Sequence, residues 1–231
     1  SFQKNFIIRH KMQQEIRNYL NSEGFLEIET PFLTKSTPEG ARDFLVPARM
    51  SHGSFYALPQ SPQIFKQILM VAGFDKYYQV ARCFRDEDLR ADRQLEFTQI
   101  DMEMSFIEET DIMSVVENML AKVFKSALNI EIKTPFEKMP YDTAMLKYGS
   151  DKPDTRFEMF IEDFSSELAN CGFGVFSGAV AKGGAVRGLC IPSGAKFSRS
   201  EIDGLTKFVS EYGAKGLAWM KVTSGGAESN I

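Results

Sequence analysis

Two strand-like segments joined by a charged loop, at residues 77–106, constrain the fold of this chain more than any other stretch. The connection is too long for a tight two-residue hairpin. Apolar residues recur at every second position of the return segment and are predicted to share one face of a sheet: Ile100, Met102, Met104 and Phe106. The polar residues between them share the other face: Gln99, Asp101, Glu103 and Ser105. The sequence therefore predicts a β-ribbon with one apolar and one polar face.

The polar face is open to two interpretations. Arg85 and Glu87, two residues apart near the end of the outgoing strand, are predicted to lie on one face, together with the polar residues of the return strand if the two polar faces coincide. A half-exposed antiparallel strand alternates in this way even when it binds nothing. A face with this much charge is costly, however, unless something polar binds to it. The alternation alone thus allows a solvated surface or a binding surface.

The composition is that of a globular protein outside the membrane. The chain has 231 residues, 43% of them hydrophobic and 25% charged. We expect no membrane partner and a cytoplasmic location, because no apolar run is long enough to span a bilayer and no signal peptide is found. Three widely spaced cysteines (Cys83, Cys171 and Cys190) indicate a reduced compartment. The net charge of −4 does not by itself indicate a nucleic-acid partner, although it does not exclude one basic edge.

Before the ribbon, the pattern predicts a helix at residues 9–22, a strand that ends at Pro31, and a hairpin of residues 44–47 and 55–58. A second helix, residues 61–72, is predicted with Ser61 as its cap. Its expected core face consists of four apolar residues: Ile64, Phe65, Ile68 and Leu69. Gln63 and Lys66, three residues apart, are expected on a different face of this helix.

After the ribbon, helices are predicted at residues 110–129, capped by Thr110, and at 141–148. The turn-rich segment 149–156 is the best candidate for a domain boundary. Beyond it we expect helices at 163–169 and 198–212 and strands at 173–176, 186–191 and 217–222. Segment 177–184 lacks the Gly-Lys-Ser/Thr ending of a phosphate loop and is interpreted as a flexible connection.

The residues of the ribbon resemble motif 2 of the class II aminoacyl-tRNA synthetases, and more narrowly the bacterial-type aspartyl-tRNA synthetases. Three runs carry the resemblance: Phe84-Arg85-Asp86-Glu87, the loop of residues 88–94, and residues 96–101. The helix and strand that end near Pro31 resemble motif 1, which implies a homodimer interface. The resemblance implies an α+β fold, with a class II antiparallel sheet flanked by helices at residues 1–155 and the start of a smaller α+β insertion domain at 156–231.

The resemblance further implies an aspartate–tRNA ligase, which activates aspartate with ATP and Mg²⁺ and then transfers it to tRNA. Arg85 would be the catalytic residue, because it neutralises the α-phosphate. The implied ATP-binding residues are Arg85, Asp86, Glu87 and Gln94. The implied aspartate-binding residues are Glu39, Ser61, Gln63, Lys66, Arg85, Gln99 and Asp101. For Lys66, the expected contact is the side-chain carboxylate of aspartate.

Two parts of the family pattern are not found: the third motif, with its second ATP-binding arginine, and the anticodon-binding barrel. The expectation is therefore a central piece of a longer enzyme that is inactive alone. A sister enzyme for asparagine or lysine is disfavoured by the loop at residues 88–94, and a non-catalytic binding or dimerisation module is the second alternative. The role of Glu103, a metal site within these residues and the charging of asparagine tRNA stay open.

Overall fold

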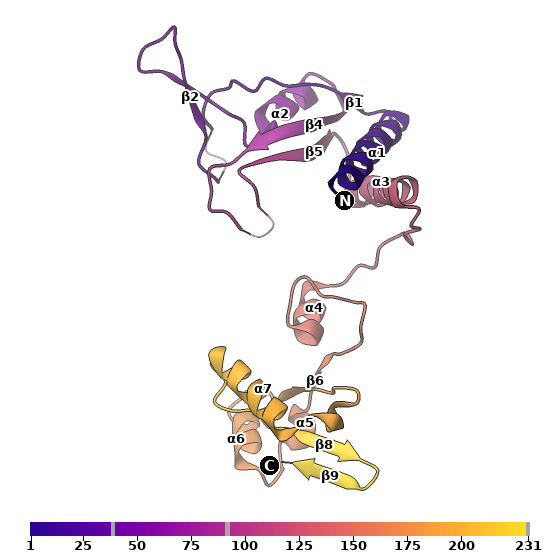
Figure 1. Cartoon of the computed structure of the whole chain (residues 1–231), viewed down its shortest axis with the longest axis vertical. Coiled ribbons are helices and arrows are strands. Elements are labelled where there is room, and N and C mark those ends of the chain that lie inside the picture. Colours follow the sequence, from indigo (N-terminus) through magenta and orange to yellow (C-terminus); the bar gives the residue numbers. More distant parts are fainter. Residues whose placement is uncertain (38–39, 91–92, 230–231) are drawn as a thin grey trace. The chain divides into compact units, whose positions relative to one another are not determined.

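A computed structural model describes residues 1–37, 40–90 and 93–229 of the chain (Figure 1). Its internal contacts divide the chain into two compact units, Ser1–Phe136 and Glu137–Ile231. Each unit combines helices with small sheets, as expected for the α+β class. The predicted domain division between residues 155 and 156 stays a prediction.

The first unit contains the predicted ribbon. Its elements in chain order are α1 (Phe2–Ser22), β1 (Leu26–Glu27), β2 (Leu45–Pro47), β3 (Phe55–Ala57), α2 (Gln63–Val71), β4 (Lys76–Phe84), β5 (Glu96–Met104) and α3 (Glu109–Leu128). Strands β1, β4 and β5 form one sheet in that order, with β1 parallel and β5 antiparallel to β4. Strands β2 and β3 form the expected hairpin, which extends away from this sheet (Figure 1).

The register of β4 and β5 fixes which side chains share a face. The strands pair continuously from Lys76 opposite Met104 to Phe84 opposite Glu96. The residue Phe106 was predicted on the apolar face, and this is wrong, because its side chain is 98% exposed and its φ of 55° turns the chain after the strand. The predicted ribbon is thus confirmed over the length of β5 itself.

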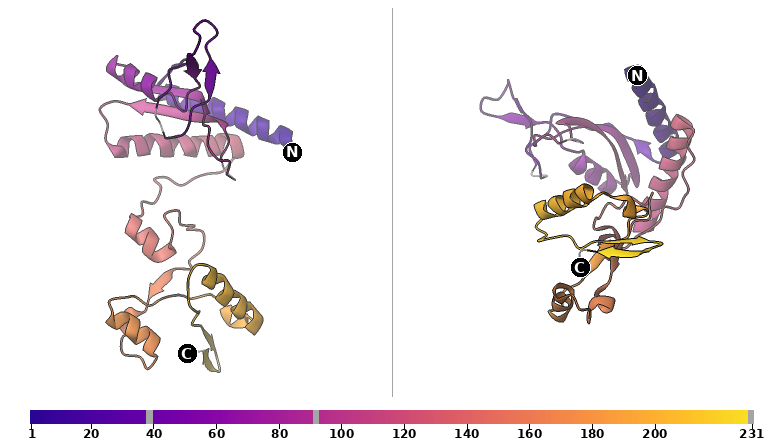
Figure 2. Two further views of the ribbon diagram at one scale, coloured as in Figure 1. Left: turned by 90° about the vertical axis from the view of Figure 1, so that its left-hand side faces the viewer. Right: turned by 60° about the horizontal axis from the view of Figure 1, so that its bottom comes forward.

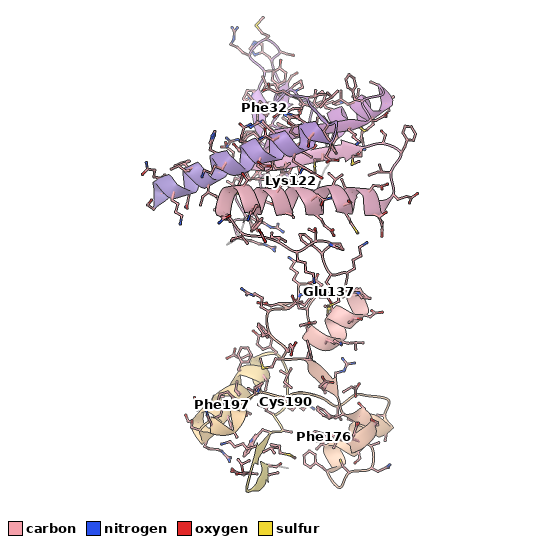
Figure 3. The ribbon with its side chains drawn as sticks, turned by 90° about the vertical axis from the view of Figure 1, so that its right-hand side faces the viewer. Phe32, Lys122, Glu137, Phe176, Cys190 and Phe197 are labelled. Carbon is pink, nitrogen blue, oxygen red and sulfur yellow. The ribbon has the colours of Figure 1, made fainter. Side chains whose placement is uncertain are left out.

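Helices α1 and α3 lie side by side and cover the apolar face of the ribbon (Figures 2 and 3). The buried residues of this core are Ile16, Tyr19, Leu20, Phe25, Tyr78, Met119 and Val123. Ile100, Met102 and Met104 of β5 pack against them, as the alternation predicted. Lys122 of α3 (Figure 3) places its ammonium 4.6 Å from the centre of the Tyr19 ring and joins the two helices at their surface.

The N-terminal boundaries of the two covering helices differ from the prediction. Helix α1 begins at Phe2, so it includes residues that the apolar spacing did not mark. Helix α3 is capped by Glu108 and not by Thr110, because Glu108 and Asp111 form a reciprocal capping box. A glutamate at the cap is less common than a threonine, which is why the sequence favoured the wrong residue.

The second unit contains α4 (Tyr141–Tyr148), β6 (Ile161–Asp163), α5 (Ser165–Leu168), α6 (Gly174–Ala181), β7 (Arg187–Leu189), the 3₁₀ turn η1 (Gly194–Lys196), α7 (Arg199–Glu211), β8 (Met220–Thr223) and β9 (Gly226–Ser229). Strand β6 pairs with β7, and β8 with β9, both antiparallel. The capping box of Ser198 and Glu201 at the start of α7 is confirmed.

The strand predicted at residues 173–176 and the connection at 177–184 are wrong, because most of both segments forms α6. A short apolar run of small residues does not distinguish a strand from a buried helix by periodicity alone. In the part of the chain that the structure describes, no helix combines the length and the apolar character needed to cross a bilayer.

Candidate functional site

The second face of the ribbon carries polar residues from both strands. The pairing sets four pairs side by side on this face: Tyr77 with Glu103, Gln79 with Asp101, Ala81 with Gln99, and Cys83 with Phe97. Because the opposite face is filled by α1 and α3, these side chains point away from the main apolar core. This face is the candidate site.

Helix α2 contributes Lys66, whose side chain lies against the polar face. Its Nζ is 2.9 Å from Asp101 Oδ1 and 3.2 Å from Glu103 Oε2. Lys66 is only 9% exposed and is the one buried residue of α2, while Ile64 and Ile68, which were predicted in the core, are 45% and 56% exposed. Burial alone would lower the pKa of Lys66, but the hydrogen bonds and charges of the two carboxylates outweigh it and hold that pKa above its usual value.

Asp101 is the more enclosed of the two carboxylates. Its side chain is 10% exposed, against 32% for Glu103. Its second oxygen, Oδ2, is buried and accepts no hydrogen bond from any described residue. A buried carboxylate oxygen without a donor is uncommon in a folded protein, and it marks a place where a ligand or a water molecule completes the network.

A buried amide supports this region from the neighbouring strand. Gln79, 4% exposed and directly opposite Asp101, accepts hydrogen bonds from Thr30 at 3.0 Å and from the Tyr77 hydroxyl at 2.9 Å. Burial, together with the nearby charges of Asp101 and Glu103, raises the pKa of Tyr77 well above its usual value. Tyr77 therefore stays a neutral donor, and Gln79 is held in a fixed orientation.

Arg85 lies just beyond the end of β4. Its guanidinium stacks 5.0 Å from the centre of the Phe97 ring, which belongs to the polar face. Phe97 is four residues from Asp101 on the same strand, a separation of about 13 Å. The structure therefore places Arg85 and the pair of Lys66 and Asp101 over the same sheet face, at two separate positions along it.

The loop that carries the expected ATP-binding residues is anchored at its base. The Asp86 amide donates to the Arg42 carbonyl at 3.0 Å, and Glu87 forms an ion pair with Arg93 at 3.3 Å. A hollow of about 250 Å³ is lined by Gly40, Ala41, Arg42, Asp86, Glu87 and Asp88. Gln94, also expected at the ATP, is exposed on the return side of the loop.

Residues before α2 and in its first turn form a second hollow of about 220 Å³, lined by Thr34, Lys35, Thr37, Asp43, Ala57, Leu58, Pro59, Gln60, Ser61, Ile64 and Phe65. Gln60, 4% exposed, is held by hydrogen bonds to Asp43 and to the backbone of Ala41. Ser61 was predicted to cap α2, but the cap position is Pro62, which has no capping side chain. Gln63 is half-buried in the first turn of the helix.

The remaining expected residues fall in different places. Gln99 accepts a contact of 3.1 Å from the Cys83 thiol on the polar face. Glu39 lies outside the described residues. Gln79 and Tyr77 were not predicted as part of the site, since strand alternation places them on a face only once the register of the two strands is known. Glu103 was noticed in the sequence without a role, and the structure places its carboxylate against Lys66.

The described residues contain no group of three histidine, cysteine or carboxylate side chains arranged to hold a metal ion. The carboxylates of Asp86, Glu87 and Asp88 line one hollow, and oxygen ligands of this kind suit Mg²⁺.

The description "tRNA synthetases class II (D, K and N)" belongs to the family that matches residues 1–215. This chain is a member of that family. The match covers both the ribbon and most of the second unit. The α+β architecture with its antiparallel ribbon is the fold of a class II synthetase domain.

Individual relatives narrow the resemblance. The chain is 74% identical over all of its residues to the Aspartate--tRNA(Asp/Asn) ligase of Endomicrobium trichonymphae, and it spans 40% of that protein. It is 58% identical over 98% of its length to the ligase of the same name from Anoxybacillus flavithermus, of which it spans 38%. An asparaginyl-tRNA synthetase from Pyrococcus horikoshii, solved with asparaginyl-adenylate, matches 55% of the chain and 29% of its own length, with 22% identity and a TM-score of 0.49. The chain thus spans about two fifths of the length of the two aspartate ligases.

Proposed function

We propose that the full-length protein that contains this chain is an aspartate–tRNA ligase. It would join aspartate to ATP to form aspartyl-adenylate and pyrophosphate, and then transfer the aspartyl group to tRNA. The names of the relatives support aspartate as the amino acid, and they extend the proposal to both aspartate tRNA and asparagine tRNA. The proposed location is the cytoplasm.

The observation that carries the proposal is the buried ammonium of Lys66 on the polar face. A lysine buried under an amphipathic helix is costly, and a solvated surface lysine would not need two carboxylates to hold it there. A fixed positive charge is what distinguishes the side-chain carboxylate of aspartate from the neutral amide of asparagine. Asp101, with its unpartnered oxygen, suits the ammonium group of the same amino acid.

The other expected residues take roles that follow from charge. Arg85 would neutralise the α-phosphate as the amino-acid carboxylate attacks it, while Glu87 and Gln94 would bind the ATP. Catalysis would consist of positioning and neutralising charge, without a covalent intermediate on the protein. Mg²⁺ would enter with ATP, where it supplies charge neutralisation on the phosphates.

The direct test is ATP–pyrophosphate exchange by the full-length protein with aspartate, asparagine or lysine, the three amino acids of the family. We expect exchange with aspartate at least about 100-fold faster than with the other two. A preference for asparagine or lysine would contradict the proposal. This chain by itself is expected to show little or no exchange, because the relatives are more than twice as long.

The alternative is a non-catalytic module derived from a synthetase. The exchange rate of the Arg85→Ala variant distinguishes this alternative from an active ligase. The exchange rate should fall by about 10²- to 10³-fold, the usual cost of removing a group that stabilises charge in the transition state. Arg82→Ala is a matched control, because Arg82 is three residues earlier, on the helix-covered side, and exposed in an ion pair with Glu96. Equal rates for the wild type and Arg85→Ala would favour the inert module.

A homodimer through the motif 1 region is also proposed. Leu26, Phe32 and Leu33 follow α1 and are 53%, 41% and 54% exposed, and exposed apolar side chains of this kind suit a protein partner. Leu33→Glu should convert the full-length dimer to a monomer in light scattering. A wild-type protein that is monomeric at micromolar concentration would refute this part of the proposal.

A further inference from the structure

We propose that Glu103 is a placeholder carboxylate, which binds Lys66 in the empty site and releases it to the side-chain carboxylate of the incoming amino acid. This inference rests on the proposed function, and it assigns a role to a residue that the sequence left without one.

The contacts of Lys66 supply the first step. An ammonium has three N–H donors, and two of them are used by Asp101 Oδ1 at 2.9 Å and Glu103 Oε2 at 3.2 Å. In this arrangement the positive charge of Lys66 is already neutralised. A ligand carboxylate would therefore find no free countercharge on this face at Lys66.

The charge balance supplies the second step. One ammonium and two carboxylates give the cluster a net charge of −1. The ligand brings an ammonium, proposed to lie at Asp101, and a third carboxylate, so that two resident carboxylates and the ligand carboxylate would compete for the single charge of Lys66 in a largely buried place. Uncompensated charge is costly there, because the effective dielectric constant is low. One of the two resident carboxylates has to leave Lys66 when an acidic ligand binds.

The difference in burial decides which carboxylate leaves. Asp101 is 10% exposed and directly opposite the buried Gln79, whereas the side chain of Glu103 is 32% exposed. Glu103 also has one more rotatable bond, so it can turn its carboxylate into water at little cost while Asp101 cannot. Asp101 stays on Lys66 as a permanent partner, and Glu103 is the exchangeable one.

The test is Glu103→Gln in the full-length protein, with amino-acid binding measured by calorimetry. Glutamine keeps the shape of the side chain and its hydrogen-bond acceptor but removes the competing charge. We expect aspartate to bind about five- to tenfold more tightly, and asparagine to change by less than about twofold. Aspartate binding that is unchanged or weaker in this variant would overturn the proposal, since a merely structural Glu103 would weaken both ligands together.

Two further variants control for position. Glu96→Gln makes the same substitution on the same strand but on the opposite face, where Glu96 is paired with Arg82, and it should leave both affinities unchanged. Asp101→Asn should weaken the binding of both amino acids, since the permanent partner is lost. Tighter aspartate binding in Asp101→Asn would assign the exchangeable role to Asp101 and overturn the proposal for Glu103.

A measurement on the wild-type protein does not depend on any variant. A water-soluble carbodiimide joins a carboxylate to an amine that touches it, with loss of water, so peptide mapping should find Lys66 linked to Glu103 in the empty protein. Aspartate should suppress this cross-link, and asparagine should not. A cross-link that persists under saturating aspartate overturns the placeholder role while the proposed function stands; a wild-type protein that neither binds aspartate nor supports exchange overturns both.

Discussion

The two faces of the β4–β5 ribbon are built from the same two strands and are held in different ways. On the face covered by α1 and α3, Tyr78 and its neighbours are buried among apolar side chains. On the other face, Lys66, Asp101 and Gln79 are buried among charges and amides. Alternate residues of one strand thus enter environments of opposite character.

The difference separates stability from binding. Burying apolar area contributes free energy of folding without any geometric demand beyond close packing. A buried set of charges contributes little net stability, because the cost of desolvation cancels much of the attraction between the charges. What such a set does provide is a fixed charge at a fixed position. We therefore expect mutations on the covered face to affect folding, and mutations on the polar face to affect ligand binding.

The largest effect is expected from Leu20→Ala, on the covered face. Leu20 is fully buried in the core, so its truncation should lower the free energy of unfolding by about 2–5 kcal/mol. Chemical denaturation followed by circular dichroism measures this loss. Val71→Ala is the matched control, because Val71 is 91% exposed on α2 and should change stability by less than about 0.5 kcal/mol. A similar loss in both variants would mean that the helix-covered face is not the main core.

Lys66→Met should reduce both the stability of the protein and its binding of aspartate, and a second substitution should separate these two effects. Removal of the ammonium leaves Asp101 buried without a countercharge, which we expect to cost about 2–3 kcal/mol of stability and to abolish aspartate binding. Adding Asp101→Asn should recover most of the stability, measured by denaturation, but none of the binding, measured by calorimetry. Recovery of binding in the double variant would contradict the role given to Lys66.

A smaller, pH-dependent effect is expected at Asp43, which lines the hollow next to Gln60. Burial alone would raise the pKa of Asp43, but hydrogen bonds from Ser36, Gln60 and the backbone of Thr37 hold it below the ordinary value of 3.8. A carboxylate with a lowered pKa stabilises the folded state at every pH above its ordinary pKa. This contribution disappears as the pH falls through the lowered pKa. Asp43→Asn should therefore be less stable than the wild type by about 1 kcal/mol at pH 7, and the gap should close below about pH 4. A gap that is constant from pH 7 to pH 3 would exclude this origin.

The smallest effect is expected from the exposed ion pair of Arg82 and Glu96. Both side chains are at least half exposed, although their atoms are only 2.7 Å apart. Solvent screens such a pair, so Glu96→Gln should change stability by less than about 1 kcal/mol and should be insensitive to the amino-acid ligand. A larger loss in thermal denaturation would place this pair among the groups that hold the sheet together.

The alternation of β5 was readable in the sequence because a strand has a strict period of two, and its apolar residues pack as predicted. The sequence did not show which residue of β4 lies opposite each residue of β5. The loop between the strands is long enough to permit several registers, so the position of Gln79 opposite Asp101 required the structure. The prediction of which face of α2 is buried was wrong for a similar reason. The apolar spacing of the helix favoured a buried face with Ile64 and Ile68. In the structure the sheet presents two carboxylates to the helix, and Lys66 is the residue that is buried against them.

The residues of the candidate site also divide into those that the sequence predicted and those that only the structure showed. Lys66, Gln99, Asp101 and Arg85 lie over one sheet face, as the resemblance to class II synthetases implied, and their roles remain proposals. Glu103 and Gln79 carry no local signal, because a glutamate or a glutamine on a strand is usually just solvated. Glu103 gains its partner, Lys66, from helix α2, and Gln79 gains Thr30 from the segment after β1.

Two adjacent residues of β4, Tyr78 and Gln79, connect the helix-covered face of the ribbon to its polar face. The hydroxyl of Tyr78 contacts Asn21 at the end of α1 and Glu27 of β1, and Arg17 of α1 holds the same glutamate at 3.0 Å. The next residue, Gln79, belongs to the opposite side of the strand and faces Asp101. A displacement of α1 that shifts Tyr78 along the strand axis must therefore shift Gln79 by the same amount, since the two share one peptide unit. The segment proposed to meet a second subunit and the sheet face proposed to hold the amino acid are consequently joined through one peptide unit of β4.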